Sequence, residues 1–192
     1  MPILIAEVKT QSPFGFRSEH SFEELLDVAC EVGDWVAVHT DPRWGGSLDL
    51  IRLARERLVA KGRPHVPILA KGRHDLDYHI VQARDYGADH VLIVGRMPAW
   101  KYLPHIIFET QTLYELKYFR NLKVCWNQRN LVTGLPKTET FAEARAIYDG
   151  WLCQASYIRT PDDIDPRADA VLVGEHLMEF AEHWKAKGKS DV

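Results

Sequence analysis

Close to its start the chain reads Ile3-Leu4-Ile5-Ala6-Glu7-Val8-Lys9, an aliphatic run that ends with a carboxylate and an ammonium two residues apart. Such a run predicts a β-strand. Because side chains alternate across a strand, Glu7 and Lys9 point to the same face. Burying two charges is unfavourable unless they pair or bind a ligand, so the stretch predicts a polar site at the end of a strand. The alternative is a frayed strand end whose charges reach water.

Seven more strand-like runs rich in Val, Ile and Leu follow, and helical patterns alternate with them. This alternation is typical of βα units and a parallel sheet. The expected strands cover residues 3–9, 35–40, 66–71, 90–95, 105–109, 122–127, 151–156 and 168–174.

Capping residues mark the starts of the expected helices. Ser21 and Glu24 have the spacing of a capping box. Thr140 and Glu143 have the same spacing, and Ser47 is expected to cap a helix of its own. The expected helices begin at residues 21, 47, 75, 140, 160 and 177, the one at 160 being short.

Eight strands with near-continuous apolar runs and intervening helices favour a (β/α)8 TIM barrel over an open doubly wound sheet. One connection is unusual. Between the fourth and fifth strands only Arg96 to Pro104 is available, with two prolines. A full crossover helix does not fit there, so we expect a turn or a single helical turn. We expect one compact barrel domain over residues 1–192.

The composition excludes several classes of function. With 46% hydrophobic residues, 27% charged residues and a net charge of −3, the chain has no global basic field for nucleic acid or an acidic membrane surface. Cys30, Cys125 and Cys153 are odd in number and far apart, which favours buried thiols over disulfides or a zinc site. No signal peptide and no membrane span is apparent. We expect a cytoplasmic protein.

A metal or cofactor site is not expected either. His74 and His79 are five residues apart, and no expected helix carries histidines at the four-residue spacing of a zinc motif. No glycine-rich phosphate loop of the Rossmann or Walker type is present. Trp100, Tyr102 and Leu103 on the short connection form either an exposed apolar patch for a second subunit or a cover for the barrel wall.

Polar side chains gather at the carboxyl ends of the expected strands, where barrels of this kind carry their chemistry. Together they form a nearly charge-balanced cluster that suits anion binding and proton transfer. Solvated strand ends are the alternative for each residue taken singly. The cluster contains Glu7, Lys9, Lys71, Glu109, Asn127, Arg129, Ser156, Gly174 and Glu175.

Seven stretches also occur in the order of the motifs of a known family. They are Ile5–Lys9 with Ser12-Pro13, Val38–Asp41 with Trp44–Leu48, Pro67–Lys71, Gly87-Ala88-Asp89, Phe108-Glu109, Asn127–Leu131 and Val171–Met178. In sequence and spacing they resemble indole-3-glycerol phosphate synthase nearly end to end. The resemblance implies a (β/α)8 barrel and a lyase of tryptophan biosynthesis. That enzyme closes the ring of 1-(2-carboxyphenylamino)-1-deoxyribulose 5-phosphate with loss of carbon dioxide and water.

The resemblance implies a role for each residue of the cluster. Lys71 would be the general acid, Glu109 its proton-transfer counterpart, and Glu7 the group that orients and tunes the pair. The remaining residues would bind a small phosphorylated, anionic substrate: Asn127 at its sugar hydroxyls, Lys9 and Arg129 at its anionic groups, and Ser12, Ser156 and the Gly174 backbone at its phosphate, with Leu131 and Glu175 beside them.

Several positions differ from the family pattern. The seventh strand ends in Ala155-Ser156-Tyr157-Ile158 where Glu-Ser-Gly-Ile is usual, and Gly72-Arg73 replaces Asp-Phe after Lys71. The segment after Ser12 is shortened, and we expect no counterpart of the family's N-terminal extension. Retained chemistry with an altered rim suggests another phosphorylated substrate, with Arg73 as a replacement anion contact. The alternative is a decayed paralogue that binds a ligand or partner without turnover. A second copy or a partner chain covering the barrel mouth is a further hypothesis.

Overall fold

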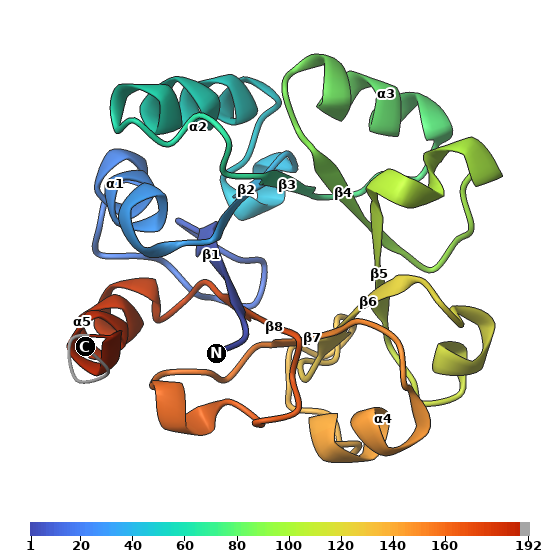
Figure 1. Ribbon diagram of the computed structural model, residues 1–192. Coiled ribbons are helices and arrows are strands. Elements are labelled where there is room, and N and C mark those ends of the chain that lie inside the picture. The colour runs from blue at the N-terminus through green and yellow to red at the C-terminus, as the bar shows by residue number, and fades with distance from the viewer. Residues whose placement is uncertain (189–192) are drawn as a thin grey trace.

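A computed structural model describes residues 1–188, in which eight parallel strands hydrogen-bond in chain order into a closed barrel (Figure 1). The predicted (β/α)8 barrel is confirmed, and the predicted strands agree with the observed ones to within two residues at each end. Residues 189–192 of the predicted domain lie outside the described residues. The strands are β1 Ile3–Val8, β2 Trp35–His39, β3 Ile68–Lys71, β4 His90–Val94, β5 Ile106–Thr110, β6 Lys123–Asn127, β7 Leu152–Ala155 and β8 Ala170–Val173.

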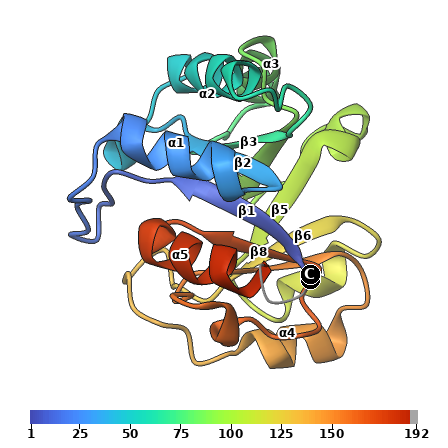
Figure 2. The same cartoon turned by 60° about the vertical axis from the view of Figure 1, so that its left-hand side comes forward.

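Within residues 1–188, five α-helices surround the barrel: α1 Phe22–Val32, α2 Asp49–Ala60, α3 Asp77–Asp85, α4 Phe141–Ile147 and α5 Leu177–Gly188. The capping boxes predicted at Ser21 and Thr140 are present. The cap predicted at Ser47 is wrong. Leu48 holds the N-cap position of α2 with helical backbone angles, so the first turn is stabilised by backbone bonds and makes no side-chain cap. Figure 2 shows α1 and α5 packed together beside β1.

Three crossovers replace the α-helix with a short 3₁₀ turn. The β4–β5 crossover contains only η2, Trp100–His105, as the two prolines predicted. The sequence did not predict that β5–β6 is reduced in the same way, to η3, Glu115–Tyr118. Between β7 and β8 the short helix expected at residue 160 is η4, Pro161–Asp163. A fourth turn, η1 at Pro42–Trp44, follows β2 and precedes α2. The barrel therefore has a thinner cover over β5 to β7, since α3 packs on β4 and α5 packs on β8.

Side chains fill the barrel interior in layers, as the alternation of strand faces requires. The middle layer is apolar and buried, and includes Ile5, Leu69, Leu92 and Ile107. At the amino ends of the strands the Trp35 ring stacks on His90, with ring centroids 4.5 Å apart. The two ends of the barrel interior therefore differ: aromatic rings lie at the amino ends of the strands, and polar residues lie at the carboxyl ends.

The three cysteines are free and buried, as predicted. Cys125 and Cys153 are register partners on β6 and β7 and lie in the apolar middle layer. Among residues 1–188 no group of His, Cys, Asp or Glu side chains is arranged to hold a metal ion. Within the same part of the chain, every helix is too short or too polar to cross a membrane.

Candidate active site at the barrel mouth

The carboxyl ends of the strands surround a pocket of about 560 Å³. It brings together ten of the eleven residues predicted for the site from the sequence. They are Glu7, Lys9, Lys71, Glu109, Asn127, Arg129, Leu131, Ser156, Gly174 and Glu175. The exception is Ser12, which is buried in the loop after β1, where its Oγ accepts a hydrogen bond from the Phe14 amide at 3.3 Å.

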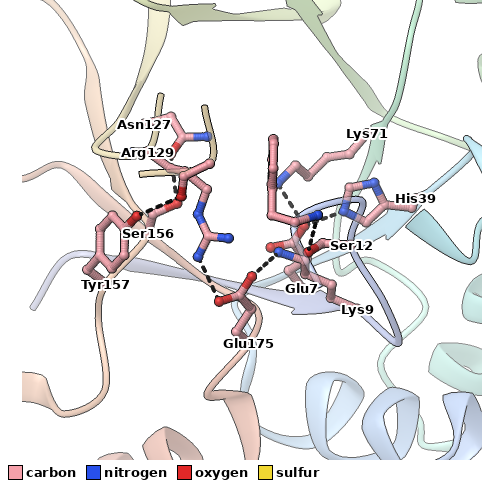
Figure 3. Close-up of polar contacts among 12 residues, drawn as sticks. Glu7, Lys9, Ser12, His39, Lys71, Asn127, Arg129, Ser156, Tyr157 and Glu175 are labelled. Atoms are coloured by element: carbon pink, nitrogen blue, oxygen red, sulfur yellow. Dashed lines mark hydrogen bonds and ion pairs between the residues drawn. The ribbon is translucent and has the colours of Figure 1, made fainter. Parts of the chain in front are cut away.

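Glu7 is the centre of one hydrogen-bonded group (Figure 3). Its Oε1 accepts from Lys71 Nζ at 2.7 Å and lies 2.6 Å from His39 Nε2. His39 and Lys71 are register partners on β2 and β3, so the three groups come from three neighbouring strands. The other carboxylate oxygen, Oε2, lies so close to Gly174 that a Cβ there would be 2.2 Å away. Glu7 is therefore fixed from both sides.

The charges of this group stabilise one another. Burial alone would raise the pKa of Glu7, but Lys71 and His39 outweigh it and hold that pKa well below its usual range. Burial likewise acts to lower the pKa of Lys71, but the carboxylates of Glu7 and Glu109 raise it above its ordinary value. Lys71 is thus a protonated acid, and Glu7 an ionised carboxylate, at neutral pH.

A second group forms on β5, β6 and β7 and contains Glu109. Asn127 donates from Nδ2 to Glu109 Oε1 at 2.9 Å. The amide oxygen of Asn127 accepts from Ser156 Oγ at 2.7 Å and from the Arg129 backbone N–H at 2.9 Å. Asn127 and Ala155 are register partners, which places Ser156 one residue beyond the end of β7. The amide is held by all three contacts and orients the Glu109 carboxylate toward the pocket.

The third group is an ion-paired bridge across the mouth. Glu175 accepts from Lys9 Nζ and from Arg129 Nη2, each at 2.7 Å. Both cations also lie over aromatic rings: Lys9 is 4.9 Å from the centroid of Trp44, and Arg129 is 5.2 Å from that of Tyr157. Burial lowers the pKa of Lys9 despite the nearby carboxylates. The pKa of Glu175 is lowered, because its two cationic partners outweigh the opposing effect of burial.

The positions that differ from the family pattern lie around the same pocket. Ala155 is buried and apolar at the end of β7. Ser156 and Tyr157 both have left-handed backbone angles, with φ of 70° and 57°. Such angles favour glycine, so Tyr157 introduces strain as well as bulk. Arg73 lines the pocket but is exposed and pairs with Asp75 at 3.1 Å.

His39 is the functional candidate that sequence reasoning missed. The rule that identified the other residues, inspection of strand ends, would have found it at the end of β2. His74 also lines the pocket, but its Nδ1 is 2.8 Å from the Leu92 carbonyl and its ring is buried, which fits a structural role. On η2, Trp100 is 82% exposed, whereas Tyr102 and Leu103 are half-buried against the barrel wall.

Comparison with known proteins finds relatives that carry two different names. The chain is 30% identical over 203 residues to a multifunctional tryptophan biosynthesis protein from Phanerodontia chrysosporium, covering 92% of this chain and 26% of that protein. It is 30% identical over 156 residues to the indole-3-glycerol phosphate synthase of Neisseria gonorrhoeae, covering 69% of this chain and 56% of that enzyme. The chain therefore spans about half or less of the length of these relatives. No family model matches it.

Solved structures share the fold. The barrel superposes on monomers of the dimeric phosphoribosylanthranilate isomerase from Thermotoga maritima with a TM-score of 0.64 and 14% identity, covering 98% of this chain and 97% of that one. A citrate synthase, SbnG, gives a TM-score of 0.60 at 12% identity, covering 100% and 95% of the two chains. At these identities the likeness concerns the barrel alone.

Proposed function

Since the chain belongs to the indole-3-glycerol phosphate synthase family, we propose that its barrel mouth binds a small phosphorylated, anionic substrate and acts on it as a carbon–carbon lyase. The reaction proposed is the ring closure of 1-(2-carboxyphenylamino)-1-deoxyribulose 5-phosphate, with loss of carbon dioxide and water, in cytoplasmic tryptophan biosynthesis. A divergent relative acting on a similar substrate falls within the same proposal.

One observation supports the proposal most. Lys71 is buried, is held 2.7 Å from Glu7, and has its pKa raised by Glu7 and Glu109 over the opposing effect of burial. An ammonium held in place by a buried carboxylate is a well-oriented proton donor. The ring closure needs such a donor twice, at the substrate ketone and at the departing hydroxyl oxygen.

The other side chains suit the remaining steps. Glu109, oriented by Asn127, accepts the proton released when the new ring becomes aromatic. Asn127 binds the sugar hydroxyls, and Lys9 and Arg129 bind the anionic groups. Ser156 and the Gly174 backbone bind at the phosphate end, a common place for phosphate in this fold. Each step is a proton transfer or a binding contact made by the chain's own residues.

Ala155 supports a second candidate function, binding without turnover. Its methyl group stands, buried, at a strand end where the family pattern has a carboxylate. Tyr157 adds a ring on the phosphate side of the same pocket. A chain with this rim binds a phosphorylated ligand or a partner protein through the retained cluster and leaves it unchanged.

An assay with the proposed substrate separates the two candidates. The purified protein is given the carboxyphenylamino-deoxyribulose phosphate while indole fluorescence is followed, with K71M as the inactive variant and K101M, at an exposed lysine, as the matched control. Fluorescence gain in wild type and K101M alone supports the lyase. Fluorescence no higher than that of K71M overturns the lyase, and calorimetric titration with indoleglycerol phosphate then tests binding without turnover.

A further inference from the structure

Every lysine and arginine that lines the pocket is already ion-paired. Five Lys or Arg residues line it, and each lies within 4.0 Å of a carboxylate. Five carboxylates line it as well, so the formal charge of the lining is zero with neutral histidines. The pairs are Lys9–Glu175, Arg129–Glu175, Lys71–Glu7, Arg43–Asp41 and Arg73–Asp75. An anionic ligand therefore meets no unpaired lysine or arginine on this lining.

Glu175 alone balances two of these cations. Its two oxygens take one partner each, Oε1 from Lys9 and Oε2 from Arg129. Figure 3 shows its carboxylate between the two cations. This is the geometry in which a carboxylate or phosphate group of a ligand would itself bind the pair. Glu175 thus occupies the position that the proposed function assigns to an anionic group of the substrate.

Of the three groups in the barrel mouth, the ion-paired bridge has the carboxylate that a ligand could displace most easily. The Glu175 side chain is 17% exposed, against 5% for Glu7. Glu7 is confined by His39, Lys71 and Gly174, whereas within residues 1–188 the Glu175 carboxylate hydrogen-bonds only to Lys9 and Arg129. Glu175 lies in the short connection between β8 and α5, outside both elements.

We infer that Glu175 is a specificity-determining residue, a resident counter-ion that competes with the anionic group of a ligand for Lys9 and Arg129. The inference rests on the proposed function only in taking these two cations as the anion-binding pair. It restricts the pocket to ligands whose carboxylate or phosphate binds strongly enough to displace a carboxylate of the chain. Weak or isolated anions bind more weakly for the same reason.

Direct binding measurements test this without turnover. We expect E175Q to bind benzoate or inorganic phosphate at least tenfold more tightly than wild type in calorimetry at low ionic strength, because glutamine removes the competing charge and keeps the size. Benzoate and phosphate separate a carboxylate from a phosphate preference. The matched control is E179Q, at an exposed carboxylate of α5, which should leave both affinities unchanged.

The double variant E175Q/R129Q tests whether the tighter anion binding takes place at Arg129. Its affinity should return to that of wild type or below. Equal or weaker binding by E175Q, or a gain that survives R129Q, overturns the inference. Circular dichroism checks that each variant is folded, and a wild-type crystal soaked in benzoate provides a second test. The benzoate carboxylate should replace the Glu175 carboxylate as the partner of Arg129. An anion bound elsewhere would contradict the inference. If the protein fails the lyase assay but E175Q still binds the anions more tightly, the proposed function is refuted and the inference about Glu175 stands.

Discussion

His39 Nε2 lies 2.6 Å from Glu7 Oε1, the same oxygen that accepts the Lys71 ammonium. The imidazole also stacks on Trp44, with centroids 5.0 Å apart and planes 3° from parallel. Burial lowers the pKa of His39 despite Glu7, so the ring is neutral at pH 7 and donates from Nε2. His39 therefore orients the carboxylate that holds the proposed acid.

We expect His39→Leu to lower the free energy of unfolding by about 1–3 kcal/mol, because a buried carboxylate loses a donor. Urea denaturation measures this, and His65→Leu, at an exposed histidine, should stay within about 0.5 kcal/mol of wild type. The pH profile of any turnover should also move in His39→Leu, since Glu7 and Lys71 lose their orientation. A variant as stable as His65→Leu would contradict the assigned contact.

Gly174 is expected to tolerate no side chain. A Cβ there would lie 2.2 Å from Glu7 Oε2, so Gly174→Ala must displace Glu7 and weaken its bond to Lys71. We expect a loss of about 1–3 kcal/mol in the free energy of unfolding, and a lower pKa of Lys71 when its ammonium is followed by NMR. Gly62→Ala, at a left-handed residue in open space, is the comparison. It should lose about 1 kcal/mol through backbone strain and leave Lys71 unaffected.

Tyr157 has a left-handed backbone, with φ of 57°. We therefore expect Tyr157→Gly to be more stable than Tyr157→Ala by about 1 kcal/mol, because only glycine adopts this conformation without strain. Both variants lack the ring, so lost contacts cancel in the comparison. At exposed Val132 the order should reverse, with alanine the more stable. Chemical denaturation of the four variants decides, and a Tyr157→Ala protein more stable than Tyr157→Gly would refute the assignment of strain.

His90 makes the stability of the barrel depend on pH. Burial, and then Lys123, lowers its pKa from 6.5 to about 4. Between these two values the unfolded chain binds a proton that the folded chain does not, so this contribution to stability is lost as the pH falls from about 6.5 to about 4. We expect His90→Phe, which keeps a ring against Trp35, to lose less stability over that range than wild type. Thermal unfolding at a series of pH values measures this, with His65→Phe as control. Parallel pH curves for wild type and His90→Phe would contradict the prediction.

Much of the barrel could be predicted from the sequence because its signals are local. Aliphatic runs mark the eight strands, Ser21 and Thr140 mark helix starts, and the two prolines before β5 exclude a helix there. The cap at Ser47 failed because a capping residue indicates a helix start without fixing its position. The reduction of the β5–β6 crossover to η3 was missed, since residues 111–121 contain no comparable proline signal.

The candidate site, too, could be predicted from the sequence only in part. Its members could be found from strand ends, because the closed barrel brings those ends together whatever the detailed packing. Their partners could not. That Lys71 and His39 share one oxygen of Glu7 depends on the β2–β3 register. That Glu175 bridges Lys9 and Arg129 depends on side-chain conformations at three separate points of the barrel.

The uneven cover of the barrel has a consequence for its motions. Helices of nine to twelve residues pack around β1 to β4 and β8, whereas 3₁₀ turns and the seven-residue α4 cover β5 to β7. Amide protons of β5 and β6 should therefore exchange with solvent faster than those of β1 and β2, through sub-global opening. Glu7 and Lys71 lie on the slowly exchanging half, and Glu109 and Asn127 on the other. The proposed proton donor therefore lies on the more rigid half of the barrel, and the proposed proton acceptor lies on the half that opens more readily.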